Sequence, residues 1–383
     1  MFTLKMPSKI YETIIVGAGI SGLACARKLQ DSNEDFLVIS KDIGGRILES
    51  SDGTVNYGAF FICSDYYNVL KYVKIKYEIK LRDFCFHEED DSYILFEPKF
   101  LAYSIQFIKV LKILYKFRKK LRKFRKASEN ISQKKTIESD PFLYKLYMQN
   151  ASDFVKEKKL QTGTDKYLSK GLYSTTFSKI DEMNAFSYLQ FIIPLITPIY
   201  TFTFEKDKMI ETFKDKINIG TVSDVKFSNG KYKVKCGKET LQSKNIVLAT
   251  QINDSKKYAN IKNVNKPVST NMLHVKGKPK KIISRKNYQV FSHPSNVQAI
   301  ADLLDGTYLF YYKYTRPSLE KYFFKPEIIA HQFWDPAGTI NGHNLIESVR
   351  GNNMFLIGDY NVAGLEESYI TGIFAANQII KSD

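Results

Sequence analysis

The sequence predicts an α/β protein with two domains, one of which is assembled from separate segments of the chain. Three observations indicate this architecture. A glycine-rich turn between a strand and a helix lies near the N-terminus, a strand-and-helix pattern lies at the C-terminal end, and a block of strands lies between them. The chain of 383 residues also exceeds the size at which one hydrophobic core usually stops growing. We expect both ends and the middle block to form one domain, and the remaining segments to form a mixed α+β domain.

The segment from Tyr11 to Leu29 is predicted to be a β-turn-α unit. The run from Thr13 to Val16 is rich in β-branched residues and suits a strand buried on both faces, and good helix formers continue to Leu29. Glycines spaced as G-x-G-x-x-G permit a tight turn, a close approach of a pyrophosphate to the backbone and close helix packing, while the helix N-terminus favours an anion. We therefore expect a Rossmann-like dinucleotide site at the turn, whose residues are Gly17, Ala18, Gly19, Ile20, Ser21 and Gly22.

The second strand, Phe36 to Ile39, ends at Ser40, where dinucleotide sites usually carry an acidic residue that binds the ribose. Either the carboxylate of Asp42 reaches the ribose, or Ser40 binds it more weakly. Lys41 lies between these two residues and is included among the expected cofactor contacts.

Two glycines and an arginine follow this strand, and a second glycine-containing segment comes after them. Two glycines let the backbone pass close to a ligand, and an arginine next to them can bind phosphate in a bidentate manner. This pattern resembles the flavin-containing amine oxidase superfamily, which includes phytoene desaturases and protoporphyrinogen oxidases. The resemblance implies contacts with FAD from Gly44, Gly45, Arg46, Tyr57, Gly58, Ala59 and Phe60.

The sequence departs from the family pattern at two places in this region. The link from the second strand to Gly44 is shorter than in the family, and Asn56 stands where the family usually has aspartate.

The C-terminal end supports the same resemblance. A strand from Asn353 ends in Gly358 and Asp359, and a helix follows it to the end of the chain. In the family, such an aspartate lies against the ribityl-pyrophosphate part of FAD, and the helix N-terminus lies near the flavin pyrimidine edge. The resemblance therefore implies FAD contacts from Gly358, Asp359, Glu367 and Ser368.

The middle block is predicted to form a helix, a strand, a hairpin with a turn at residues 228–230 and a further strand. The resemblance implies that Val222 flanks the adenine, and that Ala249 and Thr250 close the nucleotide site. We therefore expect a discontinuous FAD-binding domain of residues 1–62, 205–260 and 335–383, and a substrate domain of residues 63–204 and 261–334.

An uncharged, aromatic-rich segment from Met183 to Phe204 belongs to the expected substrate domain. Pro194 and Pro198 argue against a membrane-spanning helix, so we interpret the segment as a buried wall of this domain. In the family such segments line the substrate cavity. An apolar or aromatic substrate would fit a cavity that includes this wall together with Phe60, Phe61, Tyr311, Tyr312 and Trp334.

The cysteines and histidines show no metal-ligand spacing, and no metal site is expected. With no signal peptide before the first strand and no C-x-x-C motif, a reducing cytoplasm is the simplest location. No cysteine lies in the last third of the chain, where family members with covalent flavin carry the linking cysteine, so we expect non-covalent FAD. The four cysteines are Cys25, Cys63, Cys85 and Cys236.

The net charge of +17 is concentrated in one segment, because Lys109 to Lys135 contains twelve basic residues and one acidic residue. Apolar residues spaced by three and four positions predict an amphipathic helix from Phe107 to Lys126. Its cationic face is either solvated or attaches the protein peripherally to an anionic membrane surface. The polar segment from Ser128 to Ser139 is predicted to be a mobile loop, and no nucleic acid partner is expected.

The resemblance implies an FAD-dependent dehydrogenase, desaturase or oxidase that takes a hydride from an apolar or amine-type substrate onto flavin N5. A second G-x-G-x-x-G motif is missing, so electrons would pass to oxygen, a quinone or another soluble acceptor. The alternative is a non-redox protein of the same fold, either a flavin-dependent isomerase or a scaffold like the GDP-dissociation inhibitors. Ser40 and the sequence of Glu366, Glu367 and Ser368, where the family has Glu-Gly-Ala, leave this alternative open. The residues do not identify a catalytic base.

Overall fold

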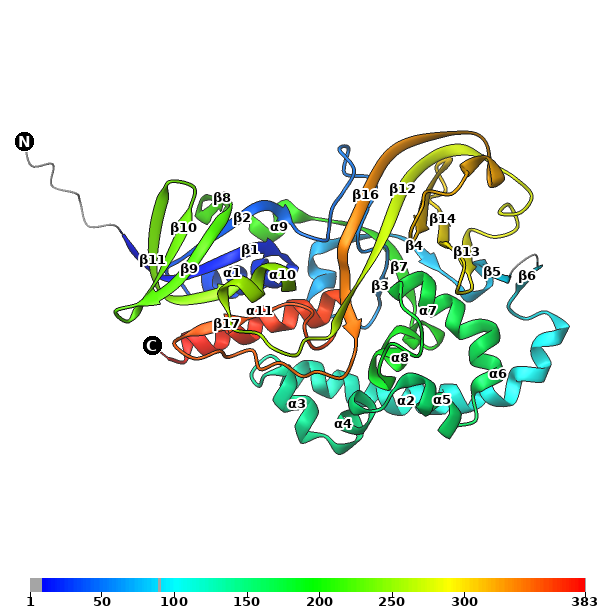
Figure 1. Cartoon of the computed structure of the whole chain (residues 1–383), viewed down its shortest axis with the longest axis horizontal. Coiled ribbons are helices and arrows are strands. Elements are labelled where there is room, and N and C mark those ends of the chain that lie inside the picture. The colour runs from blue at the N-terminus through cyan, green and yellow to red at the C-terminus, as the bar shows by residue number, and fades with distance from the viewer. Residues whose placement is uncertain (1–8, 89–90, 383) are drawn as a thin grey trace, which may run out of the picture.

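The structure is a computed structural model that describes residues 9–88 and 91–382. Figure 1 shows one sheet with the C-terminal helix beside it, a second sheet at the opposite end of the molecule, and a group of helices beneath the second sheet. This arrangement confirms the predicted α/β class with a Rossmann-like domain and a second mixed domain.

The first sheet has seven strands in the order β8-β2-β1-β11-β10-β9, and β17 pairs with β11. β1 lies parallel to both β2 and β11, as expected for a dinucleotide-binding sheet. The predicted hairpin turn is present, because Asn229 and Gly230 both have positive φ, at 52° and 73°. The strands are β1 (Ile10–Gly19), β2 (Phe36–Gly44), β8 (Ile217–Ile219), β9 (Val222–Ser228), β10 (Lys231–Cys236), β11 (Glu239–Leu248) and β17 (Met354–Leu356).

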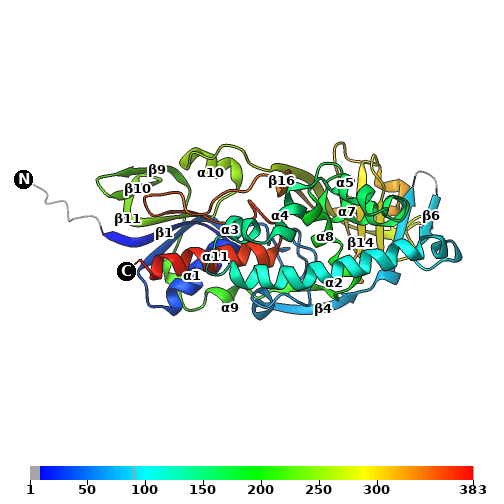
Figure 2. The same cartoon turned by 90° about the horizontal axis from the view of Figure 1, so that it is seen from below.

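Helices cover both faces of the first sheet. α1 (Ile20–Asp31) and α11 (Leu365–Ile380) pack on one face, and α10 (Ile252–Tyr258) packs on the other. Figure 2 shows α1 and α11 next to each other. They approach so closely that a Cβ at Gly372 would lie 2.1 Å from the carbonyl oxygen of Ser21. The short helix α9 (Lys206–Ile210) also packs against α1.

The second sheet also has seven strands, in the order β16-β12-β15-β14-β13-β5-β6, and a small third sheet has the order β3-β7-β4. β16 continues the second sheet beyond the expected domain boundary at residue 335. The second sheet contains β5 (Phe84–Glu88), β6 (Asp91–Ile94), β12 (Lys266–Pro279), β13 (Tyr288–Phe291), β14 (Val297–Asp302), β15 (Thr307–Tyr312) and β16 (Phe323–Asn341). The third contains β3 (Ile62–Cys63), β4 (Val73–Ile79) and β7 (Ile199–Phe204).

The boundary expected after residue 62 also differs in the structure. Ile62 and Val69 pack in the same hydrophobic cluster as α1 and α11, and so do Phe202 and Phe204 of β7. The third sheet therefore joins the two domains and belongs to neither alone.

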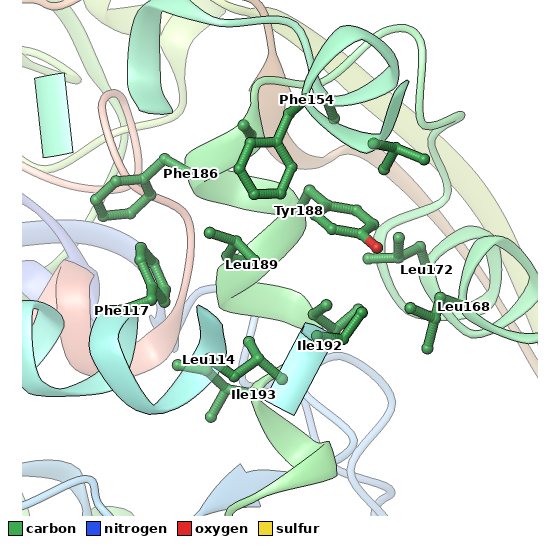
Figure 3. Packing of buried hydrophobic residues seen from close by; sticks show 14 of the residues in the cluster. Leu114, Phe117, Phe154, Leu168, Leu172, Phe186, Tyr188, Leu189, Ile192 and Ile193 are labelled. Atoms are coloured by element: carbon green, nitrogen blue, oxygen red, sulfur yellow. The ribbon is translucent and has the colours of Figure 1, made fainter. Parts of the chain in front are cut away.

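Seven helices lie between β6 and β7. The longest, α2, confirms the amphipathic helix predicted from Phe107 to Lys126. Its apolar stripe is buried, and in Figure 3 its Leu114 and Phe117 face Phe186 and Leu189 of α8. The helices are α2 (Ser104–Ala127), α3 (Gln133–Ser139), α4 (Pro141–Met148), α5 (Ala151–Glu157), α6 (Gln161–Gly163), α7 (Ser169–Thr176) and α8 (Ala185–Phe191).

The prediction of a loop from Ser128 to Ser139 was wrong for most of its length, because α3 forms there. The hydroxyl of Ser132 accepts a hydrogen bond from the backbone N–H of Lys135 at 3.3 Å and caps this helix. Thr136 and Ile137 are buried. The polar sequence did not indicate this helix, because the buried face of a seven-residue helix is too small to produce a clear hydrophobic period.

Short 3-10 or π turns complete the chain. They are η1 (Val69–Tyr72), η2 (Leu81–Asp83), η3 (Pro98–Tyr103), η4 (Thr164–Leu168), η5 (Ile193–Leu195), η6 (Lys214–Lys216) and η7 (Leu319–Lys321). The apolar segment from Met183 to Phe204 is divided among α8, η5 and β7. Within residues 9–88 and 91–382, none of the helices combines the length and apolar character that crossing a bilayer requires.

Candidate functional site

A cavity of about 950 Å³ extends from the glycine-rich turn at the end of β1 into the second domain. Both domains contribute to its wall, and nearly all the residues predicted to contact a cofactor line it. These are Gly17, Ala18, Gly19, Ile20, Ser21, Ser40, Lys41, Gly44, Gly45, Arg46, Gly58, Ala59, Phe60, Val222, Ala249, Thr250, Gly358, Asp359 and Ser368.

The glycine-rich turn provides both a close approach to the backbone and free N–H groups. A Cβ at Gly22 would lie 2.0 Å from the carbonyl oxygen of Gly17, so this position needs glycine for helix packing. A Cβ at Gly19, in contrast, would meet no atom of the described residues within 4 Å. The first turn of α1 has no acidic residue, and no side chain in the described part of the chain caps it. The N–H groups and the helix dipole at this point can therefore bind an anion.

β2 runs directly into the second glycine pair. Gly44 still pairs with Gly19 of β1 after a bulge in the register, so no connecting loop is needed, which explains the short link noted in the sequence. Ser40 lies in this extension, and its hydroxyl accepts a hydrogen bond from the N–H of Ala18 at 3.0 Å. Ser40 thus supports the glycine turn, while Asp42 lines the cavity and is exposed.

Arg46 and Asp359 form a bidentate ion pair in the cavity wall, with both N–O distances at 2.7 Å. Arg46 also donates to the carbonyl oxygen of Ala337 at 3.1 Å, and Asp359 accepts from the N–H of Thr339 at 3.2 Å. Burial alone would raise the pKa of Asp359, but the charge and hydrogen bonds of Arg46 lower it below its ordinary value of 3.8. The two residues that the sequence assigned to separate ligand contacts are therefore held together as one charged unit.

Three of the predicted contacts lie outside the cavity lining. Gly22 is enclosed by its packing against Gly17. The Tyr57 hydroxyl lies 3.2 Å from Nδ1 of His274, and the backbone carbonyl oxygen of Tyr57 accepts a hydrogen bond from the indole N–H of Trp334. The carboxylate of Glu367 is fully buried and paired with Arg125 of α2 at 2.7 Å. The assignment of Glu367 needs correction, because this ion pair directs its carboxylate toward α2.

Asn56, the departure from the family pattern, also has a structural role. It is buried, it does not line the cavity, and its amide donates to the carbonyl oxygen of Phe202 at 2.6 Å. A carboxylate could not donate this hydrogen bond, so the amide at this position secures β7.

The far half of the cavity is apolar and comes mainly from the second domain. The wall predicted from Met183 to Phe204 contributes Phe191, Ile192, Pro194, Leu195 and Ile199, and Phe60, Phe61, Tyr311 and Trp334 also line the cavity. Tyr312 does not, because it packs in a different hydrophobic cluster. A second set of lining residues was not predicted from the sequence, namely Leu81, Phe84, Phe86, Tyr167, Leu168, Leu172 and Phe177. These residues carry no shared local signal and meet only through tertiary packing.

Charge is unevenly distributed along the cavity. Apart from the exposed Asp335 of β16, the charged side chains that line the cavity belong to its glycine-lined half. The full set is Lys41, Asp42, Arg46, Asp254, Lys257, Asp335 and Asp359. The apolar half has only neutral polar groups, which include Thr176, Tyr288, Gln289 and Tyr311. Burial raises the pKa of Tyr288 to about 12, so its hydroxyl is neutral at physiological pH. The Tyr311 hydroxyl is buried and has no hydrogen-bond partner among the described residues.

Comparison with known proteins agrees with this geometry. The family of NAD(P)-binding Rossmann-like domains matches residues 15–75. No curated protein matches the chain by sequence.

Several solved structures are similar over nearly the full length. A putrescine oxidase bound to putrescine has 12% identity and a TM-score of 0.70, over 98% of this chain and 100% of that one. A CLA-producing fatty acid isomerase from P. acnes has 14% identity and a TM-score of 0.69, over 98% and 99% of the two chains. Cyclohexylamine oxidase from Brevibacterium oxydans has 13% identity and a TM-score of 0.65, again over 98% and 99%.

The glycine-rich turn, the two-domain architecture and these similarities lead to the same result. The chain has the fold of the flavin-containing amine oxidase superfamily, and its residues 15–75 match the family of NAD(P)-binding Rossmann-like domains.

Proposed function

We propose that the protein is an FAD-dependent oxidoreductase that binds FAD non-covalently and acts on an uncharged, largely apolar substrate. The observation that carries this proposal is one continuous cavity, which joins a glycine-lined end suited to a dinucleotide with an apolar end in the second domain. A dehydrogenase, a desaturase and an oxidase all fit this description.

The residues present fit FAD. The N–H groups from Gly17 to Ser21 would hold the pyrophosphate, and the open space at Gly19 leaves room for it beside the backbone. Val222, Ala249 and Thr250 would enclose the adenosine. Arg46, oriented by Asp359, would supply positive charge near the phosphates or the ribityl chain. The segment from Gly58 to Phe60, together with Ser368, would lie beside the flavin ring.

FAD, when bound, supplies a hydride acceptor at N5. The protein contributes substrate orientation and a dry environment, because aromatic and aliphatic side chains surround the apolar half of the cavity. Tyr311 adds one neutral hydroxyl there, whose free hydrogen-bonding capacity suits a single polar group of the substrate.

The distribution of charge favours a neutral substrate over a cationic amine. A buried ammonium group needs a carboxylate partner, because an unpaired buried charge carries a large desolvation cost. Among the described residues that line the apolar half, no carboxylate is present apart from the exposed Asp335. Of the two substrate classes that the sequence suggested, we therefore propose the apolar class.

Two observations support non-covalent binding and a reducing location. No cysteine lines the cavity within the described part of the chain. Cys25, Cys63, Cys85 and Cys236 are all free thiols, as expected in the cytoplasm. We propose that oxygen, a quinone or another soluble acceptor reoxidises the protein.

A visible absorption spectrum of the purified protein tests the proposal. We expect yellow protein, or protein that becomes yellow on addition of FAD, from which acid or heat releases the flavin. Addition of putrescine under anaerobic conditions should leave the flavin absorbance unchanged. Colourless protein that takes up no FAD would refute the cofactor and favour a scaffold, and rapid bleaching by putrescine would refute the neutral substrate.

A further inference from the structure

Helix α2 has a second apolar stripe on the side opposite the one that packs in the core. The buried stripe contains Phe107, Val110, Leu114, Phe117, Leu121 and Phe124. The opposite side is exposed, with Ile105 at 69%, Ile108 at 52% and Tyr115 at 61%. Phe96 and Leu101, which precede the helix, are exposed at 64% and 74%. The spacing of 101, 105, 108 and 115 places these side chains on one face.

The cations of α2 divide into those that form ion pairs and those that do not. All three arginines pair with Asp65: Arg118, Arg122 and Arg125 lie 3.2, 3.9 and 3.4 Å from its carboxylate, and the side chain of Arg122 is 56% exposed. Lys120 pairs with Asp140, and Lys126 pairs with Glu129. Five lysines of the helix have no ion pair within residues 9–88 and 91–382; these are Lys109, Lys112, Lys116, Lys119 and Lys123.

The five lysines are exposed, and they lie on the same side of α2 as the exposed apolar residues. No acidic residue occurs from Ser104 to Ser128. In Figure 2, α2 runs along the outside of the molecule, and its N-terminal half points away from the first sheet. We call the surface formed by these five lysines together with Phe96, Leu101, Ile105, Ile108 and Tyr115 the α2 surface.

We propose that the α2 surface docks the protein on an anionic lipid bilayer. Apolar side chains beside unpaired lysines match the two parts of such a bilayer, which are its acyl boundary and its negatively charged headgroups. The helix would lie on the membrane without crossing it. The apolar contact would come from the exposed stripe, because the protein core occupies the apolar stripe that the sequence predicted.

The α2 surface adjoins the apolar end of the cavity. Leu95 and Phe107 line the cavity, and their neighbours Phe96 and Ile108 belong to the α2 surface. An apolar substrate dissolved in the bilayer would therefore reach this end of the cavity over a short distance. This second statement depends on the proposed function, whereas membrane docking does not.

Co-sedimentation with lipid vesicles tests docking directly. The probes are vesicles of phosphatidylcholine alone and of phosphatidylcholine mixed with phosphatidylglycerol, each at low and high salt. We expect binding to the anionic vesicles only, and weaker binding at high salt because salt screens the lysines. The variant Lys112→Gln, Lys116→Gln, Lys119→Gln should bind at least about tenfold more weakly, because each lysine near the surface contributes to binding. The variant Ile105→Ser, Ile108→Ser should also bind more weakly.

A matched control removes the same charge from the other end of the molecule. Lys233, Lys235 and Lys238 are exposed in and after β10, so the variant Lys233→Gln, Lys235→Gln, Lys238→Gln should bind like the wild type. Equal loss in both triple variants would overturn the proposal, as would an absence of binding to anionic vesicles. Concentration-dependent dimers that Ile105→Ser, Ile108→Ser abolishes, without vesicle binding, would assign the surface to self-association instead. Because sedimentation requires no cofactor, failure here leaves the FAD proposal unaffected.

Discussion

The helices α1 and α11 both begin at the wall of the cavity and pack against each other, but their first turns differ in charge. The first turn of α1 has no acidic residue, whereas that of α11 has Glu366 and Glu367, both fully buried. The sequence predicted an anion at the start of α1, and the resemblance implied that the start of α11 lies near the flavin. Of these two helix starts only that of α1 favours an anion, because the carboxylates of α11 already stand where an anion would be favoured.

The two carboxylates of α11 connect this helix to η1 and to α2. Glu366 accepts hydrogen bonds from the N–H groups of Asn68 and Val69 at 3.0 Å, at the start of η1. Glu367 pairs with Arg125 of α2, whose guanidinium also lies over the ring of Tyr66 at 5.1 Å. The comparison shows that one helix start can bind a ligand while a neighbouring one anchors the helical part of the second domain to the first sheet.

The largest expected effect is on this anchor. Glu367→Ala should lower the free energy of unfolding by about 3–5 kcal/mol, because it leaves the buried Arg125 with only the longer contacts to Asp65 and to the ring of Tyr66. Denaturant unfolding measures the change. Lys126→Ala is the control, since Lys126 is 77% exposed in its pair with Glu129 and should cost less than about 1 kcal/mol. Similarly small losses of unfolding free energy in both variants would contradict the anchoring role of Glu367 at the start of α11.

Substitutions at two glycines of the α1 turn should distinguish a role in helix packing from a role in ligand binding. Gly22→Ala should destabilise the protein by about 1–3 kcal/mol, because its Cβ would overlap the carbonyl oxygen of Gly17. Gly19→Ala should leave unfolding nearly unchanged, since φ is −74° and the space around its Cβ is free of described atoms. It should nevertheless weaken FAD binding at least tenfold, about 1.4 kcal/mol, because the methyl group would occupy the pyrophosphate position. Thermal unfolding and FAD titration distinguish the two effects, and unchanged FAD affinity in Gly19→Ala would place the pyrophosphate elsewhere.

The ion pair near the start of α11 should matter more for the cofactor than for stability. We expect Asp359→Ala to weaken FAD binding by about 1–3 kcal/mol, because Arg46 loses the partner that orients it. Asp254→Ala is a suitable control, because Asp254 also lines the cavity but pairs with the exposed Lys257. Quenching of FAD fluorescence measures both affinities, and an equal loss in both variants would show that only net charge matters.

The smallest expected effect concerns pH. The pKa of Asp359 is depressed in the folded protein, so its contribution to stability is fully present above its ordinary value of 3.8 and is lost as pH falls through the depressed value. Each unit of depression corresponds to about 1.4 kcal/mol. The difference in unfolding free energy between wild type and Asp359→Asn should therefore be constant above the ordinary value and shrink below it. A difference that disappears well above 3.8 would contradict the Arg46 ion pair.

The sequence alone determined the features that depend on neighbouring residues. The turn at Gly17 to Gly22, the hairpin at Asn229 and Gly230 and the course of α2 follow from backbone preferences and from a period of 3.6, which are properties of short segments. These features were sufficient to predict the Rossmann-like domain and the glycine-lined half of the cavity.

Tertiary structure alone decided which groups meet. Arg46 and Asp359 are 313 positions apart, and nothing in either segment indicates that they pair. The same holds for Glu367 and Arg125, and for the apolar residues that complete the cavity from β5 and α7. On α2 the sequence predicted the apolar stripe that packs against α8, but it did not indicate that Ile105, Ile108 and Tyr115 form a second, exposed stripe. Long-range contacts depend on the relative positions of whole elements, which local preferences do not specify.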